Sequence, residues 1–316
     1  MKRMLTIGET MAALTPGANG PLRYVRDFHL RIAGAESNVA IGVAKLGGEA
    51  AWLSRLGQDE LGEFVLAQVR AEGVDCTHVY RDETRKTGLM LKQTGASHTS
   101  VFYYRTGSAA SALCPQDLQE SWVAGFSLLH LTGILPVLSG SCRALCEAAF
   151  ELACKNKIPI SFDPNVRQKL WQGNDYAPLL RSYAQRSTIL LLGREEGLTL
   201  YGTAETGQLV ARIFEHSAVQ LVALKDGDKG SVVVQRGGTP VLLPPVPCDC
   251  VETVGAGDAY NAGFLSGWLQ GDDLITCGRR GNIAGARATE TPGDVEGIPT
   301  ARQMALALAN QCEIER

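Results

Sequence analysis

Short apolar runs alternate with longer helical patterns along almost the whole chain, and this alternation limits the fold more than any other feature. Short runs of mostly apolar residues predict strands that are buried on both faces of a sheet. Strands separated by helices predict βαβ units, and therefore a mostly parallel sheet covered by helices. The expected strands cover residues 5–8, 51–54, 128–131, 159–162, 189–192, 221–224 and 231–234.

The helical spacing is clearest after residue 35. Val39, Val43 and Leu46 share one face at i, i+4 and i+7, and Gly47 follows as a C-terminal stop. Further helices are expected over residues 61–72, 262–269 and 301–310.

Two segments depart from the βαβ pattern, at about residues 12–32 and 87–105. Their side chains alternate between apolar and polar, so they predict antiparallel strands that stand apart from the main sheet. A small sheet built from two such insertions would form a lid over the carboxyl ends of the parallel strands, where open α/β sheets bind ligands. We expect one domain over residues 1–316, and the open edges of the lid favour a homo-oligomer formed through it.

Charge and composition exclude several classes of protein. The 30 Lys and Arg residues against 33 Asp and Glu give a net charge of −3 without a basic block, which argues against nucleic-acid binding and favours a small-molecule partner. No apolar run approaches the roughly 18 residues of a membrane span. Glu9 interrupts the apolar N-terminal residues too early for a signal peptide. We therefore expect a cytoplasmic protein without a membrane partner. Nine scattered cysteines and five scattered histidines predict reduced thiols and no zinc site.

The sharpest local feature is a glycine-rich turn, ETVGAGDAY at residues 252–260, that leads directly into a helical pattern. The small residues Gly255, Ala256 and Gly257 let backbone N–H groups approach an anion, and a helix N-terminus adds partial positive charge. Asp258 could then take a proton from a substrate hydroxyl during phosphoryl transfer. The Walker A spacing is absent, and Tyr260 stands where a Rossmann fingerprint needs glycine. On spacing alone, an ordinary helix start with Asp258 as a first-turn acid remains equally open.

This turn resembles the second signature of the PfkB, or ribokinase-like, carbohydrate kinases, which is usually D-T-x-G-A-G-D. The resemblance covers nearly the whole chain in the right order, because residues 34–40, 44–47 and 56–62 are similar to the N-terminal signature of that family. It implies a ribokinase-like three-layer α/β fold, ATP and Mg²⁺ as cofactors, Asp258 as the catalytic base, and an anion hole at residues 255–257. Some members build a monovalent-cation (K⁺) site beside this loop, and Glu252 departs from their aspartate there.

Two further segments, residues 102–111 and 161–171, resemble the 2-keto-3-deoxygluconate kinase branch of the family. The resemblance implies ATP-dependent phosphorylation of this sugar acid at its terminal C6 hydroxyl. Arginine grips a carboxylate through two hydrogen bonds, so Arg105 and Arg167 are the candidates for a carboxylate clamp, with Tyr103 beside them. Surface ion pairs remain the alternative for both arginines. Met90 stands where some members of the branch carry a tyrosine.

Other expected substrate contacts follow from the N-terminal signature and from a C-terminal loop. Gly34 would admit a sugar close to the backbone, and Asn38 offers both a donor and an acceptor to hydroxyls, although it could simply cap a helix. The full expected set is Gly34, Ala35, Asn38, Tyr103, Tyr104, Arg105, Arg167 and Asp294.

The nucleotide side is less distinctive. Residues 224–231 predict a turn between two strands and look like the phosphate and ribose loop of the family, although an ordinary hairpin turn has the same pattern. Glu196 matches the glutamate of the family's N-x-x-E motif, with Gly193 in place of asparagine, and could act on Mg²⁺ through water or be a solvated helix-start residue. The expected ATP contacts are Asn165, Lys225, Gly227, Asp228, Gly230, Ser231 and Asn282.

Three alternatives to a 2-keto-3-deoxygluconate kinase stay open. A kinase of the same fold could act on a neutral ketose such as fructose, or on a related keto-deoxy sugar acid. A catalytically silent sugar- or nucleotide-binding protein could use the same scaffold. The intact sequence GAGD at residues 255–258 argues against this last alternative.

Overall fold

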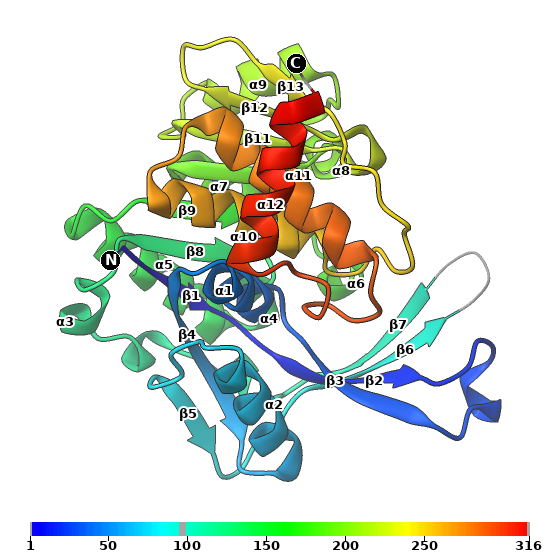
Figure 1. Cartoon of the computed structure of the whole chain (residues 1–316). Coiled ribbons are helices and arrows are strands. Elements are labelled where there is room, and N and C mark those ends of the chain that lie inside the picture. The colour runs from blue at the N-terminus through cyan, green and yellow to red at the C-terminus, as the bar shows by residue number, and fades with distance from the viewer. Residues whose placement is uncertain (1, 95–98, 315–316) are drawn as a thin grey trace.

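The protein contains two β-sheets, which a computed structural model describes for residues 2–94 and 99–314. The larger sheet has nine strands (Figure 1). From one edge to the other these are β13 (Val241–Leu243), β12 (Ser231–Gln235), β11 (Leu221–Lys225), β10 (Ile189–Gly193), β9 (Ile160–Asp163), β8 (Leu128–Thr132), β1 (Arg3–Ile7), β4 (Glu49–Gly57) and β5 (Val79–Asp82).

The pairing from β11 to β5 is parallel throughout, as the βαβ alternation predicts. All seven strands expected from apolar runs are present. The strand at 231–234 runs antiparallel because it follows β11 through the short turn η4 (Gly227–Lys229), too short for a parallel crossover. The edge strands β5 and β13 were not predicted, since neither is a continuous buried run.

Helices cover both faces of this sheet, which makes three layers. Leu190 and Leu192 point into one apolar core and Ile189 and Leu191 into the other, because side chains alternate along a strand. The first core includes residues of α3 (Glu120–Val123), α4 (Leu135–Leu138), α5 (Gly140–Lys155), α6 (Gln168–Trp171), α7 (Ala177–Arg186), α8 (Arg194–Tyr201) and α9 (Thr206–Phe214). The second includes residues of α1 (Ala35–Lys45), α2 (Glu60–Ala71), α10 (Ala256–Gln270), α11 (Leu274–Thr289) and α12 (Ala301–Ile314).

The predicted helix boundaries hold where glycine or a cap marks them. α1 ends just before Gly47, whose φ of +83° is a conformation that glycine adopts without strain. α2 begins after Asp59, whose side chain accepts a hydrogen bond from the Gly62 N–H. No helix in the described part of the chain is long and apolar enough to cross a membrane.

The smaller sheet projects from the body as the blue and cyan strands of Figure 1. Its strand order is β3 (Phe28–Ala33), β2 (Met11–Pro16), β6 (Leu89–Thr94) and β7 (Thr99–Tyr104), and we call this sheet the lid. The prediction of a wholly antiparallel lid was wrong in one respect, because β2 and β6 pair in parallel. They belong to two separate hairpins, β2–β3 and β6–β7, whose first strands run side by side. A 3₁₀ turn, η1 (Leu22–Tyr24), lies between β2 and β3.

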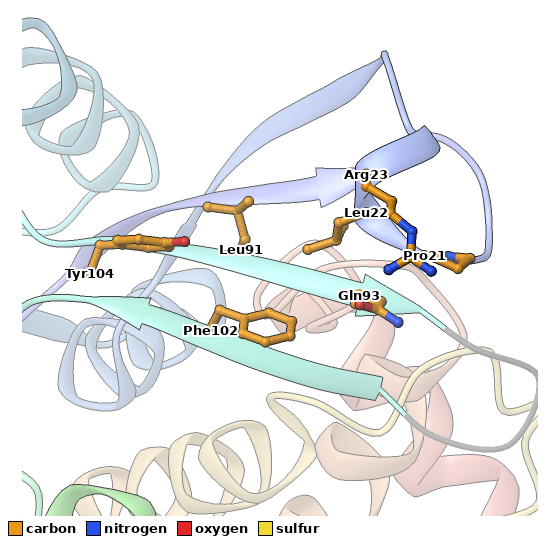
Figure 2. A pocket seen from close by; sticks show the side chains of 7 residues that line it. All are labelled: Pro21, Leu22, Arg23, Leu91, Gln93, Phe102 and Tyr104. Atoms are coloured by element: carbon orange, nitrogen blue, oxygen red, sulfur yellow. The ribbon is translucent and has the colours of Figure 1, made fainter.

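The two faces of the lid differ in character. One face holds a small apolar cluster that includes Met90, with Tyr103 packed against it. The opposite face carries Leu30, Leu14, Leu91 and Phe102, which are register partners across the four strands. This second face, which we call the outer face of the lid, is open to solvent. It holds a hollow of about 430 Å³ between β6, β7 and η1 (Figure 2).

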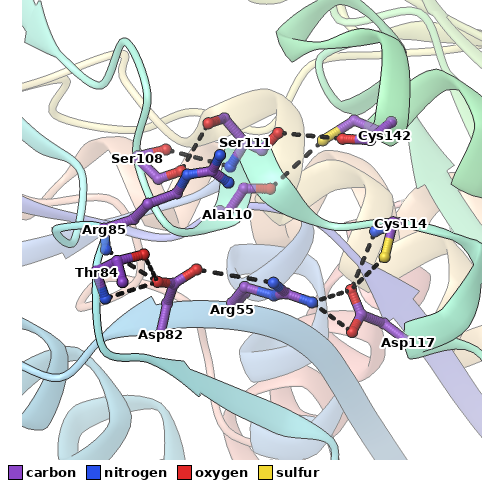
Figure 3. A network of polar contacts seen from close by, with 11 residues as sticks. Arg55, Asp82, Thr84, Arg85, Ser108, Ala110, Ser111, Cys114, Asp117 and Cys142 are labelled. Carbon is purple, nitrogen blue, oxygen red and sulfur yellow. Dashed lines mark hydrogen bonds and ion pairs between the residues drawn. The ribbon is translucent and has the colours of Figure 1, made fainter.

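A polar network fastens the segment after β7 to the large sheet (Figure 3). The Arg55 guanidinium, on β4, donates to both carboxylate oxygens of Asp117 at 2.6 and 2.8 Å and lies 3.7 Å from Asp82. Asp117 also accepts the backbone N–H of Cys114 at 3.0 Å. The short 3₁₀ turns η2 (Ala110–Ala112) and η3 (Pro115–Asp117) lie in this segment, which the network holds beside β4.

Candidate active site

Polar side chains gather where the parallel strands of the large sheet end. Thr132 ends β8, Asp163 ends β9 and Lys225 ends β11, while Glu9 follows β1 by two residues. The carboxyl ends of parallel strands lie at one edge of a sheet, the usual place for ligands in open α/β folds. The N-terminus of α10 lies at this edge too, because Lys225 contacts Asn261 of that helix.

The glycine-rich turn forms the N-terminus of α10. Gly255 precedes the helix with a φ of +84°, and a Cβ atom there would come within 2.5 Å of the Asp294 carbonyl oxygen, so two constraints require glycine. The Ala256 N–H donates to the Thr253 carbonyl at 3.3 Å. The first N–H groups of a helix have no partner four residues earlier, which leaves the exposed Gly257 amide suited to an anion.

Asp258 lies in the first turn of α10 and is buried. Its Oδ2 accepts a hydrogen bond from Asn38 Nδ2 at 2.8 Å, and its Oδ1 accepts one from Asn165 Nδ2 at 3.4 Å. Burial raises the pKa of Asp258 to about 7. The hydrogen bond from Asn38 lowers this pKa and the charge of the nearby Asp163 raises it further, but burial is the largest effect. A carboxyl group with this pKa can exchange a proton at neutral pH.

Asn38 joins two carboxylates. Its Nδ2 also lies 3.4 Å from Asp294 Oδ2, so one amide group contacts both Asp258 and Asp294. Its Oδ1 is buried and has no hydrogen-bond partner among the described residues. A buried acceptor without a partner is costly, and a ligand hydroxyl could satisfy it.

Gly34 is needed for a different reason from the one expected. A side chain at this position would come within 2.5 Å of the Glu9 carbonyl oxygen and 2.8 Å of Thr10 Cα, so the turn between β1 and β2 occupies that space. Its own carbonyl accepts hydrogen bonds from the Asn38 N–H and the Ser37 hydroxyl. Gly34 and the neighbouring Ala35 therefore start α1 and place Asn38 one turn further along.

Lys225 and Asp163 form an ion pair near the N-terminus of α10. Lys225 Nζ lies 2.8 Å from Asp163 Oδ2 and 3.1 Å from Asn261 Oδ1. Burial would raise the pKa of Asp163, but Lys225 and Asn261 outweigh it, so the pKa stays below its usual value. Lys225 Nζ is also 3.8 Å from where a Cβ of Gly257 would lie, so a fixed positive charge borders the exposed amide of that residue.

The two arginines expected to bind a carboxylate are in different situations. Arg105 is buried, and its Nε donates to Glu9 Oε2 at 2.6 Å, while its Nη2 contacts the same oxygen. Ser108 donates to the other Glu9 oxygen, and the Tyr103 ring lies beside the Arg105 guanidinium, 5.6 Å away. Arg167 precedes α6 and is exposed, and no carboxylate of the described residues pairs with it. Its charge lowers the pKa of Asp258, which places it near that carboxylate.

The side chains of two expected residues, Tyr104 and Ser231, point away from the site. Tyr104 lies on the outer face of the lid with Phe102, and 64% of its side chain is exposed there (Figure 2). Ser231 is fully buried, and its hydroxyl accepts a hydrogen bond from Tyr260 at 3.0 Å. The placement of Tyr104 follows from strand alternation, because its neighbour Tyr103 packs on the opposite face of the lid.

The remaining nucleotide-side residues form a turn and its support. Gly227 and Gly230 have φ of +57° and +86°, and a side chain on Gly230 would collide with the Leu243 carbonyl. Asp228 is exposed in the same turn. Asn282 Nδ2 donates to the Pro244 carbonyl at 2.9 Å, so this amide holds the chain after β13 against α11.

Comparison with known proteins identifies the family. The family described as "pfkB family carbohydrate kinase" matches residues 1–301. This chain is a carbohydrate kinase of the PfkB family.

The kinase is similar to proteins with established names and structures. It is 35% identical over 313 residues to the 2-dehydro-3-deoxygluconokinase of Bacillus subtilis strain 168, which covers 97% of this chain and 95% of that protein. The crystal structure of a PfkB protein from Polaromonas sp. JS666 has a TM-score of 0.88 and 34% identity, covering 96% of this chain and 99% of the other. A putative ribokinase II from E. coli, solved in complex with ATP and Mg²⁺, has a TM-score of 0.91 and 20% identity, covering 98% and 100%. The predicted ribokinase-like α/β fold is thereby confirmed.

The carboxylates near the nucleotide side fit a metal ion that binds together with ATP. Among the described residues no group of three or more His, Cys, Asp or Glu side chains could hold a metal by itself. Glu196 accepts the backbone N–H groups of Val166 and Gly193, each at 2.7 Å. Burial and the negative charge of the nearby Asp163 raise the pKa of Glu196, and a divalent cation would offset the repulsion between these two carboxylates. These carboxylates fit Mg²⁺ held mainly by phosphates and water.

Three residues of the kinase site were missed in the sequence analysis. Glu9 pairs with Arg105, Asn261 supports Asp163, and Lys92 pairs with Glu252. Only Lys92 carried a usable signal, because it lies two residues after the buried Met90 and therefore on the same face of the lid strand. Arg105 is 96 residues from Glu9, and Asp163 is 98 residues from Asn261, so no local pattern can indicate either contact.

Proposed function

We propose that this kinase transfers the γ-phosphoryl group of ATP to the C6 hydroxyl of 2-keto-3-deoxygluconate, with Asp258 as the general base. Asp258 takes the hydroxyl proton while the C6 oxygen forms a bond to the γ-phosphorus. The bond between that phosphorus and the β–γ bridging oxygen breaks, and ADP leaves. Bound Mg²⁺ would neutralise phosphate charge, and Glu196 would hold it through water.

The position of Asp258 carries this proposal. Its carboxylate is buried in the first turn of α10, next to the exposed Gly257 amide and the charge of Lys225. The pKa of about 7 lets Asp258 accept a proton at neutral pH, while the amide and the ammonium can hold negative charge on the group in transfer. A general base and an anion site are therefore only one residue apart.

Arg167 and the similarity to a named relative support the sugar acid as substrate. Arg167 is an exposed cation near Asp258 without a carboxylate partner among the described residues, so it can meet a substrate carboxylate. The Bacillus subtilis relative at 35% identity is named for this substrate. Arg105 would then act mainly by orienting Glu9 and Tyr103, because its charge is already paired.

The pairing of Arg105 with Glu9 also leaves a second substrate class open. Only one of the two expected arginines is open to a carboxylate, so a neutral ketose such as fructose, or a related keto-deoxy sugar acid, is the alternative substrate. Substrate hydroxyls could be bound through the unpartnered Asn38 Oδ1 in either case. The choice between them depends on whether a carboxylate adds binding energy at Arg167.

We also propose that two copies associate through the outer face of the lid. Phe102 and Tyr104 lie on this face (Figure 2), where they are 46% and 64% exposed. An exposed apolar face on a projecting sheet favours association, because burying it removes apolar surface from water.

The test of the kinase proposal is ADP release with Mg-ATP at neutral pH, comparing 2-keto-3-deoxygluconate, fructose and ribose at equal concentration. Strong preference for the acid is expected, and phosphorus NMR of the product should show coupling of the new phosphate to the C6 protons. Preference for a neutral sugar would overturn the substrate and leave the kinase reaction. Thermal stabilisation by ATP and sugar without ADP release from any of the three would overturn the reaction itself.

A further inference from the structure

The lid contributes a buried cation to the active site. Lys92 of β6 is 1% exposed, and its Nζ lies 2.8 Å from Asp294 Oδ1 and 2.9 Å from Glu252 Oε1. Burial alone would lower the pKa of Lys92, but Asp294 and Glu252 outweigh it and raise that pKa, so the side chain is an ammonium. An inward-facing lysine on a lid strand would be costly without these two carboxylates.

Both carboxylates are fixed by further contacts. Glu252 accepts the Gly293 N–H at 3.0 Å through its other oxygen. The other oxygen of Asp294 lies 3.4 Å from Asn38 Nδ2, and the same nitrogen donates to Asp258 at 2.8 Å. A continuous series of contacts therefore runs from the lid ammonium through Asp294 and Asn38 to the proposed base.

We propose that Lys92 is a positioning residue, a cation tethered to the lid that fixes Asp294 and Asn38 in the orientation that holds Asp258. This inference rests on the proposed role of Asp258. Without the ammonium, the neighbouring carboxylates of Glu252 and Asp294 would repel each other, and Asn38 would lose one fixed partner.

The position of Lys92 has a second consequence. Its ammonium occupies the space between Glu252 and Asp294, so the residues beside the glycine-rich turn do not fit an additional monovalent cation there. The Lys92 ammonium would therefore take the place of the monovalent cation that some members of the family hold beside this loop. Removing the charge would leave two carboxylates that a small cation from solution can join.

A matched control exists in the same lid. Arg31 of β3 pairs with Glu296, two residues beyond Asp294, and both side chains are partly exposed, at 25% and 36%. Arg31→Met removes one ion pair between lid and body and leaves the Lys92 pairs in place. Partly exposed ion pairs of this kind contribute little to stability.

The experiment compares wild type, Lys92→Met and Arg31→Met in buffers whose only other cation is tetramethylammonium, with the sugar that wild type phosphorylates best. We expect Lys92→Met to lower kcat by about 10- to 100-fold with the KM for ATP changed less than about threefold, because the base and not the nucleotide is misplaced. Ammonium or potassium chloride should then raise kcat of Lys92→Met at least about fivefold, while wild type and Arg31→Met respond less than about twofold.

Each result has a defined meaning. A kcat of Lys92→Met within about twofold of wild type would overturn the inference. A lower kcat in a variant that is folded, which neither ammonium nor potassium restores, would also overturn it. Stimulation of wild type by potassium beyond about twofold would overturn it as well, whether or not the variant folds. Absence of ADP release by wild type with every sugar would instead overturn the proposed function, so the two failures are distinguishable.

Discussion

Replacing Asp258 by asparagine should abolish turnover and at the same time stabilise the fold. The native state at neutral pH holds a buried carboxyl group whose pKa is about 7 instead of 3.8. Each unit of pKa shift corresponds to about 1.4 kcal/mol, so ionising Asp258 in the folded protein costs up to about 4 kcal/mol of stability above pH 7. The Asp258→Asn variant would avoid this cost, and its new amide could keep both hydrogen bonds if the Asn165 amide turns to present its unpartnered Oδ1.

The sign of the pH dependence follows from linkage. A carboxyl group whose pKa is raised on folding binds more protons in the native state than in the unfolded state between pH 4 and 7. Wild type therefore loses stability relative to Asp258→Asn as pH rises through this range. The difference in unfolding free energy should be near zero at pH 4 and reach its maximum above pH 7, at between about 1 and 4 kcal/mol.

Urea unfolding followed by tryptophan fluorescence at several pH values measures this difference, and nucleotide binding by calorimetry checks that the ATP site is intact. Asp273→Asn is the matched control, because Asp273 caps α11 and its backbone and side-chain bonds to Thr276 lower its pKa. That variant should show no gain in stability at high pH, and any loss should disappear as pH falls. Equal or lower stability of Asp258→Asn at pH 8, or a gain that does not vary with pH, would refute the reasoning.

Three further outcomes are expected. The rate kcat/KM should rise with pH to a plateau above about 7, because free Asp258 must be ionised to accept the proton; a rate independent of pH between 5 and 8 would contradict this. Arg167→Ala should raise the KM for the sugar acid at least about tenfold, which corresponds to about 1.4 kcal/mol of binding free energy, and should leave the KM for fructose unchanged. An equal effect on both sugars in steady-state kinetics would argue against a carboxylate contact. Wild type should sediment as a dimer and Phe102→Glu as a monomer. The control is Leu242→Glu on β13, at the far edge of the large sheet, where the replaced side chain is more exposed than Phe102 (70% against 46%); a monomeric wild type would rule out association through the lid.

The main elements of the fold could be predicted from local patterns. Continuous apolar runs predicted the central strands, and the alternating segments predicted the lid strands, because burial on one or both faces of a sheet dictates which residues can occur there. The segment from Gly255 to Asp258 stood out because backbone conformation and anion binding both demand small residues. The edge strands β5 and β13 and the parallel pairing of β2 with β6 were missed, since they depend on which segments become neighbours.

The sequence by itself determined the residue types at the site, and the tertiary structure decided what each residue does. The residues around Arg105 in the sequence do not show that Glu9 neutralises its charge. Nor do the residues around Lys92 show that it forms ion pairs with Glu252 and Asp294. These contacts join segments that are 96 to 202 residues apart. Periodicity reports which face of an element is buried, but the charge state and the partner of a buried group depend on which other segments fold against that face.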